Sequence, residues 1–233
     1  MAARANLPVA LLCTSVVFGF LARTPAEMAL RRSDQRIVHA AWAMLFASIA
    51  AAAIMTLLAY YERWWLIPLG IPVIAGPAAV VSSRALRVRW RELGELLVVA
   101  CFSALAPAAH YAAAGSLEGT GFSLWLLSAL YGGSSIFYVR MLLGGGGPPD
   151  DARPDRRFAV LVYHVALVAL VALTILVGDA PPLVAVAFAP LLAKIIYRTA
   201  RPPDKLNVVR TGLFEVSQAV LFAILVVTAY AVT

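Results

Sequence analysis

Charged residues are scarce in this chain. This scarcity restricts the classes of protein to which the chain can belong more than any sequence motif does. Asp, Glu, Lys and Arg together make up 13% of its 233 residues, against about 25% in an average soluble protein. Hydrophobic residues make up 62%, and no polar stretch is long enough to fold as a separate soluble domain. The composition therefore predicts an integral membrane protein with a single transmembrane domain over residues 1–233.

Common signatures of catalysis and cofactor binding are also missing. The two cysteines, Cys13 and Cys101, lie far apart in apolar stretches, which argues against a disulfide, a redox pair or a zinc site. The glycines at 144–147 lack the G-K-[ST] ending of a phosphate loop, and the chain has neither GxSxG nor HExxH. The net charge of +7 does not indicate nucleic acid, because 17 of 19 basic residues cluster around four short loops. We therefore expect no nucleic-acid partner and no cofactor.

Long apolar stretches are what the chain has in abundance. A membrane-spanning helix needs about 20 residues, and about 17 at the least. Eight candidate spans are Leu7–Ala22, Ile37–Ala59, Leu66–Val81, Leu96–Ala113, Phe122–Leu143, Phe158–Val177, Leu183–Tyr197 and Thr211–Val232. The third contains Pro68, Pro72 and Pro77 and should be kinked or broken, which makes seven spans the alternative count. The predicted fold is all-α, a polytopic transmembrane helical bundle of about eight spans.

Basic residues alternate strictly between the loops of this scheme. They gather after spans one, three, five and seven, whereas the intervening loops contain only Arg63 and the N-terminal tail only Arg4. Lys and Arg near span ends stay on the cytoplasmic side during insertion. The pattern therefore predicts eight crossings, with cytoplasmic basic loops and both termini outside.

Polar and ionisable residues inside predicted spans are the candidate site residues, since each is costly to place in lipid. Those that fall towards the cytoplasmic side are Tyr138, Arg140, Tyr163, His164, Glu215 and Gln218. Arg140 ends span five, where its guanidinium is placed either to meet a phosphate or to anchor the span. Glu215 is either a relay or ligand anchor, or the partner of Lys194 or Arg198 in an ion pair, and the ion pair is the favoured interpretation.

Four short stretches resemble the YwiC-like family of bacterial membrane proteins. They are FLARTP (20–25), SSIFYVR (134–140), YH (163–164) and TGLFE (211–215), which occur in the family's order along nearly the whole chain. The resemblance implies a UbiA-like bundle that lacks the first helix, in the inner membrane of a bacterium. The family is largely without assigned biochemistry, so the resemblance implies fold and location and leaves activity open.

A second interpretation comes from the acidic loop GGGGPPDDARPDRR (144–157). Enzymes of the UbiA-like layout hold magnesium with two acidic motifs, and here the nearest candidates are Asp151, Asp155 and Glu27. The glycines and prolines before Asp151 oppose a rigid helix end, and neighbouring arginines can neutralise the acids. The alternative is therefore a divergent, magnesium-dependent prenyl or lipid-group transferase. A third is an assembly partner of a respiratory membrane complex.

The favoured function is non-catalytic. We expect the protein to bind, or to transport, a small anionic or lipidic ligand in a cavity that faces the cytoplasm. The six polar residues named above would line that cavity, because they lie at a similar depth and lack a catalytic pair of acids. The lipid bilayer is the other partner that the sequence indicates, and protein partners are left open.

Overall fold

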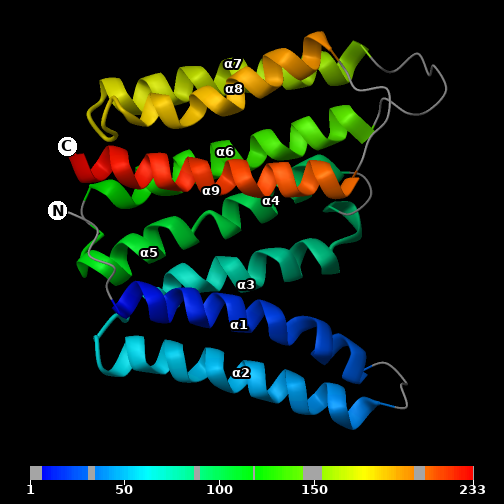
Figure 1. Cartoon of the computed structure of the whole chain (residues 1–233), viewed down its shortest axis with the longest axis vertical. Helices are drawn as coiled ribbons and strands as arrows, with labels where there is room; N and C mark the ends of the chain where they lie inside the picture. Colours follow the sequence, from blue (N-terminus) through cyan, green and yellow to red (C-terminus); the bar gives the residue numbers. More distant parts are fainter. Residues whose placement is uncertain are drawn as a thin grey trace. The chain divides into compact units, whose positions relative to one another are not determined.

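The computed structural model describes residues 7–30, 35–86, 90–117, 119–143, 154–201 and 208–232. Almost all of these residues are helical, and none of them forms a strand (Figure 1). The helices are α1 (Leu7–Leu30), α2 (Arg36–Ala59), α3 (Leu66–Ser82), α4 (Arg91–Phe102), α5 (Leu105–Ala114), α6 (Thr120–Leu143), α7 (Pro154–Leu176), α8 (Val184–Ala200) and α9 (Val208–Val232). The all-α prediction is confirmed.

The helices have the length and surface of membrane spans. Six segments are long and apolar enough to cross a bilayer: α1, α2, α4 together with α5, α6, α7 and α9. The helices α3 and α8 have 17 residues each, at the lower limit for a crossing. Many large apolar side chains face outwards, and Leu30 and Leu176 are 85% and 83% exposed. Lipid tails can cover such a surface, whereas water would make it prone to aggregation.

One predicted helix boundary is corrected, and one predicted break is not found. The first span was predicted to end at Ala22, but α1 continues to Leu30 through Pro25. The third span was predicted to be kinked or broken, and α3 is not broken, since it continues as one helix through Pro72 and Pro77. Helices within membranes tolerate proline because neighbouring groups can satisfy the freed carbonyls.

The predicted span Leu96–Ala113 is interrupted instead. It consists of α4 and α5, which are separated by a turn at Ser103 and Ala104. Pro107 explains the interruption, because it cannot donate to the carbonyl of Ser103 and its ring crowds that turn. The hydroxyl of Ser103 donates back to the carbonyl of Val99 at 2.8 Å, which closes the end of α4.

The helices form two compact units. One contains Ile71–Ala106 and the described residues after Leu117, and so includes α4, α6, α7, α8 and α9. The other contains α1, α2 and Pro107–Leu117, with the start of α3. In this second unit α1 packs along α2, and its buried apolar residues are Leu12, Leu57, Leu66, Ala108, Tyr111 and Ala112.

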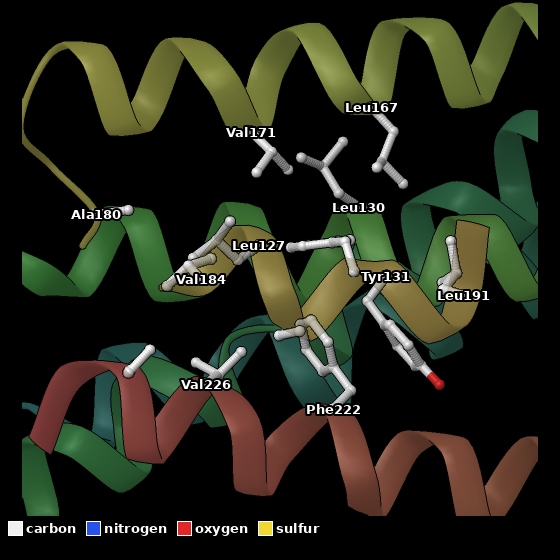
Figure 2. Close-up of a cluster of buried hydrophobic side chains, with 13 residues drawn as sticks. Leu127, Leu130, Tyr131, Leu167, Val171, Ala180, Val184, Leu191, Phe222 and Val226 are labelled. Carbon is white, nitrogen blue, oxygen red and sulfur yellow. The ribbon is translucent and has the colours of Figure 1, made fainter. Parts of the chain in front are cut away.

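The apolar core of the first unit lies between α6, α7, α8 and α9 (Figure 2). The rings of Tyr131 and Phe222 stack at its centre with 4.2 Å between centroids. Ser123 pairs with Tyr230 further along the same two helices, so α6 and α9 run antiparallel. Because lipid tails are as apolar as these side chains, close packing and interhelical hydrogen bonds hold such helices together.

Gly133 permits one of these close approaches, between α6 and α7. A Cβ atom at this position would collide with the hydroxyl of Tyr163, which donates to the carbonyl of Leu130 at 2.8 Å. We predict that Gly133→Ala lowers the stability of the detergent-solubilised protein by about 1–3 kcal/mol through overpacking. The apparent unfolding temperature measures the effect.

The matched control is Gly212→Ala in α9, where an added Cβ would meet no atom within 4 Å. It should leave the unfolding temperature nearly unchanged. Tyr163→Phe removes the colliding oxygen, so Gly133→Ala should cost less in that background. Equal costs in both backgrounds would contradict this explanation of the α6–α7 contact.

Candidate functional site

A buried ion pair joins α8 to α9 and is the centre of the candidate site. The ammonium of Lys194 lies 2.8 Å from Oε1 of Glu215, and the hydroxyl of Ser135 donates to Oε2 at 2.9 Å. The side chains of Lys194 and Glu215 are 3% and 15% exposed. The ammonium also lies 4.4 Å from the ring centroid of Tyr138, where a cation–π interaction adds to its stabilisation. We call Ser135, Tyr138, Lys194 and Glu215 the polar centre.

Helical spacing explains why these residues meet. Tyr131, Ser135 and Tyr138 are four and three residues apart, so they share one face of α6. Glu215 and Gln218 share a face of α9 with Phe222, which stacks on Tyr131. The same two helix faces therefore form an apolar contact and, about one turn further on, a polar one.

Two buried polar atoms beside the polar centre have no hydrogen-bond partner among the described residues. They are the hydroxyl of Tyr131 and Oε1 of Gln218. Tyr131 is 8% exposed, and its hydroxyl points out of the apolar cluster (Figure 2). It also lies close enough to Glu215 to interact with the charge of that residue. Most buried polar groups are hydrogen-bonded, so two unpartnered ones beside an ion pair mark a candidate binding site.

Lys194 begins a row of cations along α8. Arg198 lies four residues further on the same face, and Arg201 follows three residues later where the helix ends. Burial decreases along this row, from the buried Lys194 to the exposed Arg201. Arg198 also interacts with Tyr138 of the polar centre. Glu215 is the one acid that we find paired with this row in the part of the chain that the structure describes, so the described part of the row contains more cations than paired acids.

Arg140 belongs to a different group of charges. Its Nε donates to Glu95 at 2.9 Å, its Nη1 pairs with Glu92, and Arg91 bonds Glu95 at 3.1 Å. Two acids and two bases balance here, and the pairing fixes α6 against α4. An anion at Arg140 would have to compete with two carboxylates that the protein already supplies.

Tyr163 and His164 hold α7 against α6. The Nε2 of His164 lies 2.7 Å from the hydroxyl of Ser134, and its Nδ1 lies 2.7 Å from the carbonyl of Val160. Both ring nitrogens are therefore engaged. The Tyr163 hydroxyl donates to the backbone, and its ring stacks on Phe137 with 4.5 Å between centroids. Both side chains make the contacts of packing residues.

The three acids of the magnesium interpretation are placed as follows. Glu27 pairs with Arg23 within α1 at 2.7 Å, on an exposed surface. Asp151 lies outside the described residues, and so does the side chain of Asp155, whose backbone belongs to the first turn of α7. In the described ranges there is no group of three His, Cys, Asp or Glu residues that could hold a metal ion.

Of the six residues predicted to line a cavity, the structure brings Tyr138, Glu215 and Gln218 to one place. The sequence had suggested Lys194 only as an ion-pair partner for Glu215, and that pairing is present. Ser135 and Tyr131 were missed. Their spacing from Tyr138 on a helical face was the available signal, but it carries weight only once α9 is known to lie against that face.

The apolar helices, together with a polar centre inside them, define a multi-pass helical membrane protein. Residues 1–110 match the family model described as YwiC-like protein, which confirms the predicted resemblance over that part of the chain. The first of the four motif stretches, FLARTP, lies within the match. No match was found among curated proteins or among solved structures.

The ion pair should behave as a unit in stability measurements. At neutral pH, Lys194→Met leaves a buried carboxylate without its cation and Glu215→Leu leaves a buried ammonium without its anion. We predict a loss of about 3–5 kcal/mol for each single substitution. The double variant should be clearly more stable than either single one, as measured by thermal unfolding in detergent.

Glu27→Gln provides the control, because it breaks an exposed pair within one helix. Such pairs contribute about 0–1 kcal/mol. If the double variant lost as much stability as the two single variants added together, the two residues would not be coupled as described.

Proposed function

We propose that this protein is a non-catalytic multi-pass protein of the bacterial inner membrane that binds or transports a small anionic or lipidic ligand. The ligand would be received at the polar centre, on the side of the membrane that the basic loops assign to the cytoplasm. The observation that supports this proposal most strongly is the buried Lys194 within apolar helices, paired with Glu215, with Arg198 beside Tyr138. Ionisable groups in such positions are expensive to maintain and are typical of ligand and ion pathways.

The charge of the surroundings favours an anion. Arg198 and Arg201 extend the positive charge of Lys194 towards the exposed end of α8. Ammonium and guanidinium groups together suit a phosphate. The ligand chemistry that we propose is therefore a phosphodiester monoanion, carried either by a small soluble molecule or by a lipid headgroup.

The other predicted residues have supporting roles in this proposal. Arg140 joins α6 to α4 through Glu95 and Glu92, and His164 joins α7 to α6. These contacts keep the face of α6 that contains Ser135 and Tyr138 turned towards α8 and α9. Arg140 acts on the ligand through the position of α6.

Eight crossings are part of the proposal, with α3 and α8 as the two short ones. The interruption between α4 and α5 lies within one crossing. The basic loops then lie in the cytoplasm and both termini lie outside. The exposed end of α8 with Arg201 would face the cytoplasm, and so would the route to Lys194.

Binding of a phosphodiester tests the proposed function. Dimethyl phosphate is the soluble probe, and phosphatidylglycerol in nanodiscs is the lipid probe, with phosphatidylcholine as the zwitterionic comparison. We expect one or both anionic probes to raise the unfolding temperature of the wild type, because a ligand stabilises the state to which it binds. Lys194→Met should abolish this gain, and Arg198→Gln should weaken it.

Asp179→Asn is the control for a change of charge away from the site, since Asp179 is exposed beyond the end of α7. It should bind as the wild type does. Stabilisation by soluble phosphodiester alone identifies a small ligand, and stabilisation by phosphatidylglycerol alone identifies a lipid. If neither probe had an effect, or if Lys194→Met kept the full effect, the proposal would fail. Magnesium-dependent stabilisation by an isoprenoid diphosphate, lost in Asp151→Ala, would favour a transferase instead.

The proposed topology predicts the accessibility of single cysteines. In a variant without native cysteines (Cys13→Ala, Cys101→Ala), Ser116→Cys lies between α5 and α6 and should react with an impermeant maleimide in intact cells. Ser83→Cys follows α3 and should react only after permeabilisation. The opposite pattern, or labelling of both sites in intact cells, would contradict the assigned orientation.

A further inference from the structure

Glu215 is held by charge in the structure, yet its surroundings also suit its uncharged form. As a carboxylate it accepts one hydrogen bond from Lys194 and one from Ser135. A protonated carboxyl group additionally needs an acceptor for its own O–H. Gln218 lies one turn away on the same face of α9, and its Oε1 is buried without a partner among the described residues. The hydroxyl of Tyr131, likewise unpartnered, is a donor for the second oxygen of the carboxyl group.

From these positions we infer that Glu215 is a proton-binding site, and that one proton is taken up there for each anion bound at Lys194. In the ligand-free state Lys194 and Glu215 neutralise each other. In the ligand-bound state the anion takes the place of the Glu215 carboxylate at Lys194. The proton comes from the cytoplasmic solution and bonds to Glu215, which then donates to Gln218. The total charge of the polar centre is the same in both states.

Electrostatics is the reason for the coupling. An anion that displaces Glu215 from Lys194 would otherwise leave an unpaired carboxylate among α6, α8 and α9, where a lone buried charge is unstable. Two negative groups beside one ammonium would also repel each other strongly in a medium of low polarity. Protonation removes both costs, and two unpartnered polar atoms gain partners at the same step.

Other titratable or charged groups lie around Glu215 and Lys194 and were considered as proton acceptors. From α6 they are Tyr131 and Tyr138, from α8 Arg198, and from α7 His164, which interacts electrostatically with Lys194. His164 already uses both ring nitrogens for Ser134 and Val160. The tyrosines and Arg198 are already protonated near neutral pH, so they cannot take up another proton. Glu215 is therefore the acceptor that the geometry favours.

The inference rests on the proposed anion binding and adds the proton to it. The experiment measures dimethyl phosphate binding to the full chain in nanodiscs, from mildly acidic to mildly alkaline pH. The charge of a phosphodiester is constant over this range, so any pH dependence belongs to the protein. We expect the affinity of the wild type to increase by up to about tenfold for each unit by which pH falls, as required for one linked proton. A pH indicator in weak buffer should record about one proton taken up per molecule bound.

Three variants test whether Glu215 is the residue that takes up the proton. Glu215→Gln should bind without proton uptake and without pH dependence, because its amide stays neutral. Gln218→Met retains the ion pair but removes the acceptor, so its gain in affinity at low pH should be smaller. His164→Gln should retain the proton uptake of the wild type.

The outcomes that would overturn the inference differ from those that would overturn the proposed function. Binding by the wild type without proton uptake, or undiminished uptake in Glu215→Gln, would refute the coupling and leave anion binding intact. If Glu215→Gln did not fold, proton uptake by the wild type and by Gln218→Met would still test the coupling, since both proteins retain the ion pair. Absence of binding at every pH would refute the proposed function and the coupling with it.

Discussion

The ion pair of Lys194 and Glu215 is the interaction on which the α6–α9 part of the structure depends. Neither charge can be buried alone among apolar helices without a large cost in free energy. Each therefore fixes the position of the other, and Ser135 adds α6 to the arrangement by donating to the same carboxylate. The stacking of Tyr131 on Phe222 also holds α6 and α9 together, about one helical turn from Ser135 along α6.

A second balanced group of charges lies between α4 and α6, where Arg140 meets Glu95 and Glu92. The two groups differ in a way that bears on function. In the Arg140 group two arginines pair with two glutamates, so the charges of these four residues balance. Around Lys194, within the described part of the chain, the cations of α8 outnumber the acid that pairs with them, and two buried polar atoms have no partner. Under the proposed function, the structural and the ligand-binding groups of charge lie at different contacts of α6.

Much of this fold could be predicted from the sequence. Apolar length and the alternation of basic loops locate the helices, because both reflect the cost of placing charge in lipid. The same reasoning proposed the pairing of Glu215 with Lys194. The interruption at Ser103 and the extension of α1 to Leu30 could not be predicted that way, since local backbone geometry decides where a helix within an apolar stretch ends.

The site was predicted less well than the fold. Arg140 was expected either to meet a phosphate or to anchor its span. In the structure it pairs with Glu92 and Glu95, which lie more than 40 residues earlier in the sequence. Tyr131 and Ser135 became visible only when α9 was placed against α6. Contacts between helices that are distant in sequence depend on how the helices rotate and pair, and a hydropathy pattern contains little of that information.

Infrared difference spectroscopy of the protein in nanodiscs, recorded on addition of dimethyl phosphate, tests the central claim most directly. Exchange of the Lys194–Glu215 pair for a bound anion and a protonated Glu215 predicts a new carbonyl band of a neutral carboxyl group, absent from Glu215→Gln. A spectrum that shows anion binding without this band, or with the band retained in Glu215→Gln, would contradict it.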